Sequence, residues 1–258
     1  MAQRAAAAAG ELLLDRFGGP AQGVERKSSR TDMVSDADRD AEAMIEEILS
    51  AERPDDGLLA EEGSASEAVS GRRWVVDPLD GTTNFLYGIP GWAVSIALED
   101  GDGGAVGVVF DPVRGETYTA IREGGATLNG EPIEVSGEQR LDTALVATGF
   151  SYEAAERSTQ AAVLAEVLPR VRDIRRFGAA ALDVCWVAAG RVDAYYERGL
   201  KHWDWAAASL IASEAGAELR WLDGEPLGLV AGPPRLVEDL HQIVSAGDES
   251  QADPGSKR

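Results

Sequence analysis

The sequence has few residues of the types that carry sulfur or imidazole chemistry. A single cysteine, Cys185, excludes an internal disulfide and a cysteine-based zinc site. It lies in the apolar segment 179–189, so we interpret it as part of a buried helix. Only two histidines are present. His241 belongs to a terminal amphipathic stretch, whereas His202 either lines a site or serves packing, so neither is an obvious nucleophile.

Long hydrophobic runs are also missing. No apolar segment approaches the roughly 20 residues that a membrane-spanning helix needs. The alanine-rich start resembles a signal peptide only superficially, because it lacks a Leu/Val-rich centre and Glu11 and Asp15 soon follow. We interpret it as an ordinary first helix. The sequence therefore predicts a cytoplasmic protein with no membrane partner.

Positive charge is scarce. Lys and Arg together number 24 against 45 Asp and Glu, and the formal net charge is −21. This balance argues against attraction to nucleic acid or to anionic membranes. It would also repel phosphate esters, unless a divalent cation bound at clustered carboxylates reversed the sign locally. Because only three of the basic residues are lysines, the charge also fits a coding bias or adaptation to salt, and we give it little functional weight.

The order of apolar patterns predicts a mixed α/β protein with two closely packed halves. Strand-like runs without intervening helices indicate antiparallel strands before about residue 130, and helices then alternate with strands. Residues 1–247 are interpreted as one domain, with an N-terminal half to about 140 and a C-terminal half from about 141, and 248–258 as a disordered tail. The expected helices are 1–17, 35–49, 153–168, 179–189 and 203–215, and the expected strands are 58–60, 74–76, 93–98, 105–110, 117–121, 126–128, 145–148, 171–174, 192–196 and 217–221.

The densest group of candidate metal ligands is the segment Trp74-Val-Val-Asp-Pro-Leu-Asp-Gly-Thr-Thr-Asn-Phe85. The apolar start predicts a buried strand that delivers Asp77 to its C-terminal end, a common place for ligands in α/β sheets. Pro78 keeps Asp77 extended. A tight turn would then direct Asp77, Asp80 and the carbonyl of Leu79 to one side, as hard oxygen ligands for Mg²⁺.

The residues after this turn suit a phosphate group. Gly81 permits close approach, and Thr82 begins a helix whose free N–H groups could bind the anion. The same Asp-Pro-x-Asp-Gly string is common in plain surface turns. Its position after a buried strand makes that reading weaker.

Three further acids occur in similar settings. Glu61 follows the expected strand 58–60, and Asp204 begins an alanine-rich helix, where a lone Asp is more often only an N-terminal cap. Asp38 stands in the first turn of an expected helix, where a carboxylate favours the helix dipole. Each signal is weak alone. Together they form the set of carboxylates that a two- or three-metal phosphoryl-transfer site requires.

On these motifs the chain resembles the inositol monophosphatase family of magnesium-dependent, lithium-sensitive phosphatases. The signatures are 74–85, Trp203-Asp-Trp-Ala-Ala-Ala208 and, more weakly, Ala60-Glu-Glu62, and the resemblance runs from Lys27 to about Trp221. It implies a layered αβαβα sandwich of the inositol monophosphatase and fructose-1,6-bisphosphatase type. It also implies a homodimer.

The resemblance assigns roles to individual residues. It implies that the metal ligands are Glu61, Asp77, the carbonyl of Leu79, Asp80 and Asp204. It implies that Glu61, Asp38 and Thr82 are catalytic, with Asp38 pairing with Thr82 and helping to hold a weaker metal. It implies that Glu61, Asp80, Gly81, Thr82, Gly178, Ala179, Ala180, Glu197 and Asp204 contact the substrate. Lys27 matches a lysine near the metals whose role is less defined. Ala60 replaces the usual glycine and Ala179 a small hydroxyl residue; neither position is a metal ligand.

The implied reaction is hydrolysis by in-line attack of water at two or three Mg²⁺ ions, without a covalent phosphoenzyme. Residues 175–183 resemble the inositol-phosphatase version of the family, which favours inositol 1-phosphate with a tolerant range of polyol phosphates. Histidinol phosphate, fructose 1,6-bisphosphate and adenosine 3′,5′-bisphosphate remain alternatives. An alternative of another class is a non-catalytic factor that binds the transcription machinery, against which the complete ligand set argues.

Overall fold

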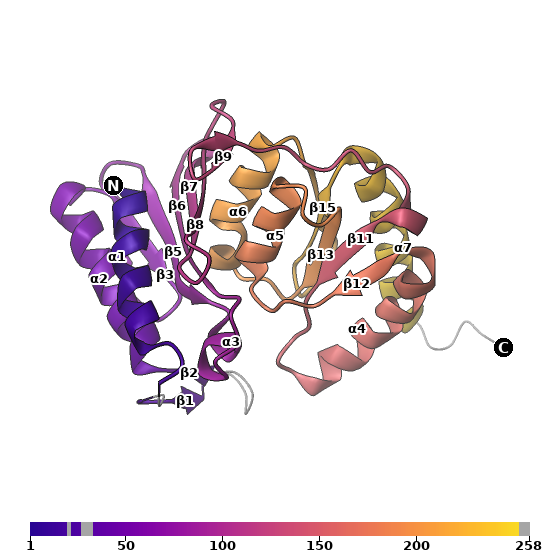
Figure 1. The fold of residues 1–258 in the computed structure, drawn as a ribbon, viewed down its shortest axis with the longest axis horizontal. Coiled ribbons are helices and arrows are strands. Elements are labelled where there is room, and N and C mark those ends of the chain that lie inside the picture. The colour runs from indigo at the N-terminus through magenta and orange to yellow at the C-terminus, as the bar shows by residue number, and fades with distance from the viewer. Residues whose placement is uncertain (20–21, 27–32, 253–258) are drawn as a thin grey trace.

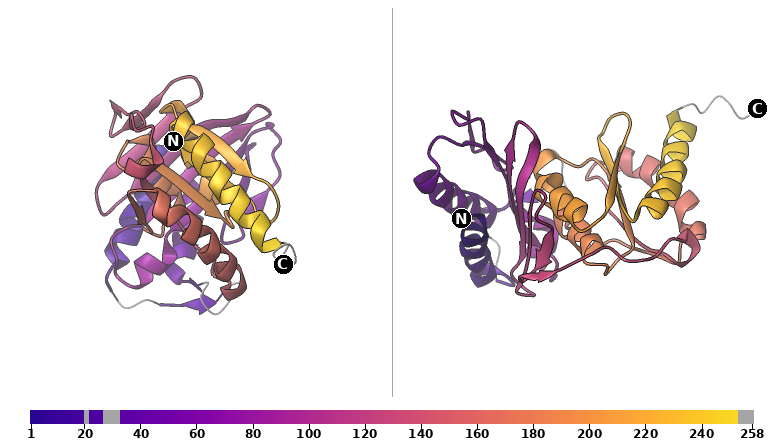
Figure 2. Two further views of the ribbon diagram at one scale, coloured as in Figure 1. Left: turned by 90° about the vertical axis from the view of Figure 1, so that its right-hand side faces the viewer. Right: turned by 90° about the horizontal axis from the view of Figure 1, so that it is seen from above.

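A computed structural model describes residues 1–19, 22–26 and 33–252. Helices and two large sheets alternate in five layers, seen from the side in Figure 1 and from above in Figure 2. The order is a helix pair, an eight-stranded sheet, a second helix pair, a five-stranded sheet and a third helix pair. The predicted αβαβα sandwich is therefore confirmed.

Seven α-helices occur in the described residues, and six of them were expected near these positions, α3 by its start alone. Their bounds are α1 (Ala2–Arg16), α2 (Asp36–Glu52), α3 (Thr82–Leu86), α4 (Ala154–Val167), α5 (Ala180–Ala188), α6 (His202–Glu214) and α7 (Pro234–Ala252). The short α3 begins at Thr82, as expected. The helix α7 was not predicted, and it runs to Ala252, within the segment 248–258 that we expected to be a disordered tail.

The larger sheet has the order β10-β9-β8-β7-β6-β5-β3-β4. Its strands are β3 (Gly57–Ala60), β4 (Ala65–Ser66), β5 (Arg73–Asp80), β6 (Ala93–Asp100), β7 (Gly103–Asp111), β8 (Glu116–Ile121), β9 (Ala126–Leu128) and β10 (Glu131–Pro132). Strands β5 to β10 pair antiparallel throughout, which confirms the expectation from their spacing. Only β3 and β5 run parallel.

The smaller sheet has the order β12-β11-β13-β15-β14. Its strands are β11 (Leu145–Thr148), β12 (Asp173–Arg175), β13 (Ala194–Arg198), β14 (Glu218–Leu222) and β15 (Gly228–Gly232). Strand β11 pairs parallel with β12 and β13, and β15 pairs antiparallel with β13 and β14. The sequence did not predict β15. A separate two-stranded sheet joins β1 (Glu25–Arg26) and β2 (Met33–Val34).

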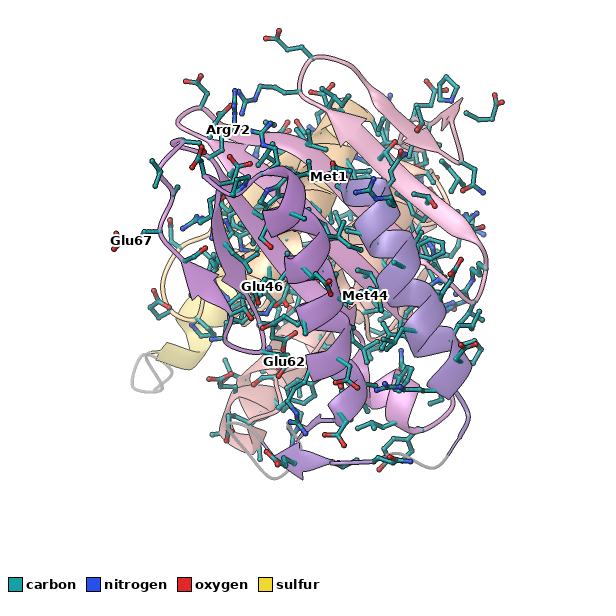
Figure 3. All side chains as sticks on the ribbon, turned by 90° about the vertical axis from the view of Figure 1, so that its left-hand side faces the viewer. Met1, Met44, Glu46, Glu62, Glu67 and Arg72 are labelled. Atoms are coloured by element: carbon teal, nitrogen blue, oxygen red, sulfur yellow. The ribbon has the colours of Figure 1, made fainter. Side chains whose placement is uncertain are left out.

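The outer helices bury one stripe each, whereas the middle helices are buried nearly all round. In α1 the buried Ala2, Ala5, Ala9 and Leu13 repeat at helical spacing against α2 and the larger sheet. Figure 3 looks onto this outer layer and shows Met44 and Glu46 on α2. Because α5 lies between the two sheets, eight of its residues, 181–188, are buried.

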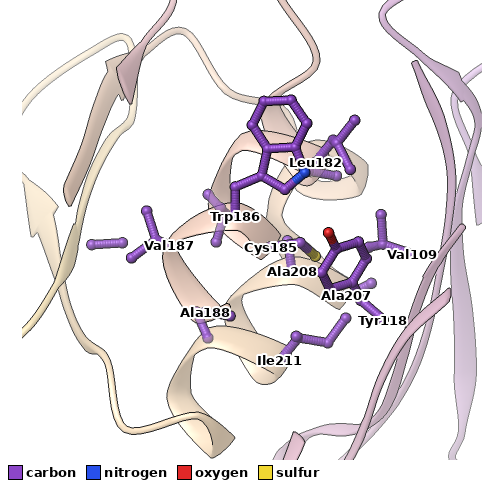
Figure 4. Close-up of a cluster of buried hydrophobic side chains, with 14 of the residues drawn as sticks. Val109, Tyr118, Leu182, Cys185, Trp186, Val187, Ala188, Ala207, Ala208 and Ile211 are labelled. Carbon is purple, nitrogen blue, oxygen red and sulfur yellow. The ribbon is translucent and has the colours of Figure 1, made fainter. Parts of the chain in front are cut away.

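The middle layer joins the two sheets into one core. Val109 and Tyr118 of the larger sheet pack with Leu182, Cys185 and Ile211 of the middle helices (Figure 4). Cys185 is fully buried, which confirms its reading as core. No helix among the described residues is both long and apolar enough to cross a membrane.

Candidate active site

A pocket of about 460 Å³ lies between the two sheets, next to the start of α5 and α6. Its lining includes Glu61, Asp77, Leu79, Asp80, Gly81, Thr82, Gly178, Ala179, Ala180, Glu197 and Asp204. All the predicted metal ligands and substrate contacts therefore meet at one place. A second pocket, of about 510 Å³ beside α1 and α2, holds none of these residues.

Asp77 and Asp80 belong to a strand that continues through them. Strand β5 reaches Asp80, and its register against β6 shifts between Asp77, opposite Ser95, and Asp80, opposite Ala93. One extra residue on β5 makes this a β-bulge rather than the tight turn that the sequence suggested. A bulge accommodates Pro78 within a sheet and brings both aspartates to the pocket.

Asp77 lies closest in the electrostatics of the site to other acids. It is buried, and its Oδ1 accepts a hydrogen bond of 2.9 Å from the amide of Leu79. Burial raises the pKa of Asp77 well above its ordinary value, and the charges of Glu61, Asp80 and Asp204 raise it further. The side chain of Glu61, which follows β3, also lies in hydrogen-bonding contact with Asp77. The electrostatic partners of Asp77 are thus other acids.

Asp80 is held by the first turn of α5. Its Oδ1 accepts the amide of Ala180 at 2.9 Å, and its Oδ2 accepts the amide of Ala181 at 2.8 Å. The residue before α5 is Ala179, which offers no side-chain cap, so Asp80 caps this helix from 100 residues away. Burial raises the pKa of Asp80 to about 7, although these amides lower it.

Thr82 and Asp38 form the pair that the resemblance implied. The hydroxyl of Thr82 lies 3.1 Å from Asp38 Oδ1 and 3.1 Å from the carbonyl oxygen of Leu79. Asp38 is the third residue of α2 and also accepts hydrogen bonds from the amide and hydroxyl of Ser35, which caps the helix. Burial raises the pKa of Asp38, partly offset by those bonds. Gly81 has φ 90°, a conformation that favours glycine.

Asp204 combines the two roles that the sequence left open. It accepts the amide of Lys201 at 2.6 Å, which makes it a cap of α6, and it also lines the pocket. Burial raises its pKa well above the ordinary value, with further contributions from Glu61, Asp80 and Glu197.

Glu197 belongs to β13 of the smaller sheet and lines the same pocket from the side opposite β5. Its Oε2 accepts the hydroxyl of Tyr195 at 2.6 Å, and burial raises its pKa. A Cβ at Gly149 would lie 2.0 Å from this carboxylate, so only glycine leaves space for it. Sequence reasoning missed Tyr195 and Gly149. The alternation of β13 could have placed Tyr195 and Glu197 on one face, but no local signal indicates Gly149.

The sequence left the roles of His202 and Lys27 open, and the structure describes only the first of them. His202 Nε2 lies 2.6 Å from Glu99 Oε1, and the ring stacks on Trp205 with centroids 4.4 Å apart. His202 is not part of the pocket lining, so its role is packing and pairing with β6. Lys27 lies outside the described residues.

The donor set fits a divalent cation by its chemistry. Asp77, Asp80 and Asp204 are carboxylates whose pKa values are raised by burial and by the charges of neighbouring acids, and oxygen ligands of this kind bind hard cations. Within the described ranges, no three acidic side chains already converge in the geometry of a metal site. Asp80 and Asp204 instead direct oxygens to backbone amides. These side chains therefore suit a divalent cation by their oxygen atoms and their place in one pocket, although they are not arranged around a single point.

The layered fold and the carboxylate-lined pocket define a phosphatase-type α/β sandwich. A family model described as the inositol monophosphatase family matches residues 1–254. The chain belongs to the inositol monophosphatase family. This membership supports a phosphatase, and the family uses divalent metal ions.

Relatives of known name carry two kinds of description. Inositol-1-monophosphatase SuhB of Mycobacterium tuberculosis is 42% identical over 240 residues, covering 88% of this chain and 83% of that protein. The Nus factor SuhB of Pasteurella multocida is 39% identical over 254 residues, covering 93% and 92%. The crystal structure of the extragenic suppressor protein suhB from Bartonella henselae matches with a TM-score of 0.89 and 39% identity, covering 95% and 96%.

Proposed function

We propose that this protein is a Mg²⁺-dependent phosphomonoesterase that hydrolyses inositol 1-phosphate, or a similar polyol phosphate, to the alcohol and inorganic phosphate. The observation that carries the proposal is the meeting of Glu61, Asp77, Asp80 and Asp204 in one pocket beside the Thr82–Asp38 pair. These residues come from the end of β3, from β5 and from α6.

The residues that would hold two or three Mg²⁺ ions are the carboxylates of Glu61, Asp77, Asp80 and Asp204 and the carbonyl of Leu79. When bound, the cations would offset the charge of the phosphate and lower the pKa of a water molecule. The raised pKa values of Asp77 and Asp204 support this assignment, because a nearby cation would favour their ionised forms.

The remaining groups handle the proton and orient the substrate. The hydroxyl of Thr82 donates toward Asp38, so its lone pairs can accept a hydrogen bond from the attacking water. Either this pair or the carboxylate of Glu61 then orients or accepts the proton of that water. The backbone at 178–180 and the carboxylate of Glu197 face the pocket from the other wall and would hydrogen-bond the alcohol.

The polyol substrate is supported by the second wall and by the relatives. Glu197 is an acceptor suited to hydroxyl groups, and its position is fixed by Tyr195. The M. tuberculosis relative is named an inositol-1-monophosphatase. A pocket of about 460 Å³ is within the ordinary range for small-molecule sites. Histidinol phosphate, fructose 1,6-bisphosphate and adenosine 3′,5′-bisphosphate are the alternative substrates.

The test is a phosphate-release screen with inositol 1-phosphate and these three alternatives, with and without Mg²⁺. We expect release to require Mg²⁺, to be fastest with inositol 1-phosphate and to be inhibited by millimolar lithium. Activity that persists in a chelator would refute the metal assignment. A clear preference for another ester would replace the substrate.

A second candidate function rests on the relatives named Nus factor. In that case the chain would bind the transcription machinery without needing catalysis. A pull-down with RNA polymerase, performed with wild type and with Asp77→Asn, separates the two functions, because binding that survives loss of phosphate release would be independent of it. The predicted homodimer is tested on the same samples by size-exclusion chromatography with light scattering.

A further inference from the structure

One face of α2 carries three carboxylates spaced four residues apart: Asp38, Glu42 and Glu46. Like charges at this spacing repel each other on an isolated helix. Here each carboxylate accepts a hydrogen bond from another segment or from the start of the helix. Figure 3 shows Glu46 and Glu62 along the same edge of α2. The acids of this face therefore serve contacts beyond the helix.

Glu42 holds the turn that carries Glu61. Glu42 is only 4% exposed; its Oε2 accepts the amide of Glu62 at 2.6 Å and its Oε1 accepts the amide of Ser64 at 2.9 Å. Both amides belong to the turn between β3 and β4, which begins at Glu61. The amide of Ala60 donates to the carbonyl of Ser64 at 2.9 Å and closes this turn. The two carboxylate oxygens of Glu42 thus hold two different amides of this turn.

One helical turn earlier, Asp38 accepts the hydroxyl of Thr82. Successive turns of α2 therefore hold the two groups to which we assign the attacking water, Thr82 directly and Glu61 through its turn. We propose that Glu42 is a positioning residue for the reaction, and that it fixes the carboxylate of Glu61 by clamping the amides of Glu62 and Ser64. The inference rests on the proposed function.

The chemistry of the clamp explains why a substitution should loosen the turn. An ionised carboxylate accepts two charge-assisted hydrogen bonds at once. A glutamine at position 42 can accept only one of them and would present an N–H₂ group to the other amide. Because residues 62–64 are partly or fully exposed, water can replace the lost partner. The turn would become mobile while the fold persists, and catalytic geometry tolerates little such motion.

The chain contains a matched control. Glu214, at the end of α6, accepts the amides of Glu123 and Gly125 at 2.8 Å each. It clamps the turn between β8 and β9, and neither that turn nor Glu214 lines the pocket. Glu46 provides a second control. It accepts the hydroxyl of Ser64 at 2.9 Å, whereas the clamped amides donate to Glu42, so Glu46→Gln removes a charge from the same face and leaves the clamp intact.

The experiment compares Glu42→Gln with Glu214→Gln and Glu46→Gln in the full chain. For Glu42→Gln we expect amide hydrogen exchange at Glu62 and Ser64 to accelerate at least ~10-fold. We also expect the Mn²⁺ dissociation constant to rise ~10-fold and kcat at saturating metal to fall ~10-fold, with KM for the phosphate ester within about twofold. Glu214→Gln should accelerate exchange only at Glu123 and Gly125. Both controls should leave Mn²⁺ binding and kcat within about twofold of wild type.

The proposal is overturned if exchange at 62 and 64 accelerates while Mn²⁺ affinity and kcat stay at wild-type values, or if Glu46→Gln lowers them equally. If Glu42→Gln does not fold, Glu42→Asp replaces it, since the shorter side chain keeps the charge and can reach at most one amide. A wild-type protein that binds Mn²⁺ but releases no phosphate refutes the proposed function alone, and the exchange and affinity data still decide the role of Glu42. A wild-type protein that does neither overturns both.

Discussion

The two walls of the pocket come from different sheets, and their carboxylates have different partners. The larger sheet contributes Asp77 and Asp80 from β5 and Glu61 from the end of β3. The smaller sheet and the middle helices contribute Glu197 and the backbone at the start of α5. On the first wall the carboxylate of Asp77 has other acids as its electrostatic partners. On the second, Glu197 is hydrogen-bonded by Tyr195.

This difference separates the part of the site that needs a cation from the part that does not. The first wall is unfavourable when ionised, because burial raises the pKa values of Asp77 and Asp80, and the charges of neighbouring acids raise that of Asp77 further. On the second wall, the hydrogen bond from Tyr195 lowers the pKa of Glu197 and partly offsets the effect of its burial. We therefore assign phosphate chemistry to the first wall and recognition of the alcohol to the second. Each assignment predicts a distinct response to substitution.

The largest effect is expected from Asp77→Asn, which neutralises the centre of the first wall. Loss of a proposed metal ligand should lower kcat about 1,000-fold, because a bound cation would supply several kcal/mol of transition-state stabilisation. In a chelator the same variant should melt at the same temperature as wild type or higher, since a buried repulsive charge is gone. Steady-state kinetics and thermal melting check both parts.

The control for this substitution is Asp111→Asn. Asp111 is fully buried and bonds Arg114 at 2.6 Å outside the pocket. Its loss should lower the melting temperature, because the ion pair between the buried Asp111 carboxylate and the partly exposed Arg114 is removed, and should keep kcat within about threefold. The comparison of the walls fails if Asp77→Asn destabilises the metal-free protein as much as Asp111→Asn does.

Metal removal at different pH values should give the next largest effect. Asp80 has a pKa near 7 in the folded protein against 3.8 as its ordinary value, so the folded state holds a proton that the unfolded state releases. In a chelator, stability contributed by this group is therefore lost as pH rises from about 4 to about 7. Thermal melting with chelator should give a lower melting temperature at pH 8 than at pH 5, and Mg²⁺ should restore more at pH 8. A melting temperature independent of pH and Mg²⁺ would contradict this.

Glu197→Gln should affect only substrates with hydroxyl groups to bind. A hydrogen bond to a charged group is worth about 1.5–3 kcal/mol, so kcat/KM for inositol 1-phosphate should fall roughly 10- to 100-fold. For p-nitrophenyl phosphate, which lacks these hydroxyls, the change should stay below about threefold. Tyr195→Phe, which removes the donor to Glu197, should show the same preference more weakly. Equal losses of kcat/KM on both substrates would show that Glu197 acts in the phosphate chemistry assigned to the first wall, not in binding the alcohol.

The smallest effect on activity is expected from Cys185→Ala. Cys185 is fully buried in α5, and burial raises the pKa of its thiol well above the ordinary value, so it is inert. The substitution should cost about 1 kcal/mol of unfolding free energy through lost packing, with kcat and KM unchanged. A thiol reagent should not modify the folded protein. Inactivation by such a reagent without unfolding would contradict this, because it would show that Cys185 is accessible and coupled to the active pocket.

Local patterns were sufficient for the elements that carry the acids. The apolar run before Asp77, the spacing of the antiparallel strands and the helix starts two residues before Asp38 and Asp204 all follow from neighbouring residues, and the structure has elements at these places. The bulge between Asp77 and Asp80 was read as a turn, because Asp, Pro and Gly favour both and only the register with β6 distinguishes them.

Contacts distant in sequence were beyond such reasoning. Nothing near Asp80 shows that it caps α5, and nothing near Gly149 shows that Glu197 needs its space. The strand β15 is a short apolar run of glycine, leucine, valine and alanine, a composition too brief to separate strand from loop. Its place follows from pairing with both neighbours in the smaller sheet. Such features depend on which surfaces meet after folding.

The close approach of α6 to the larger sheet bears on how this chain matures during synthesis. A Cβ at Gly107 of β7 would lie 2.6 Å from the carbonyl oxygen of Ala207, so helix and sheet meet with no side chain between them. A ribosome-bound chain that ends before residue 202 has neither this cover for its sheet nor Asp204 for its pocket. The N-terminal half is therefore stabilised, and the acidic pocket completed, only after α6 has been synthesised. Truncated products should be cleared by proteolysis rather than persist as folded protein.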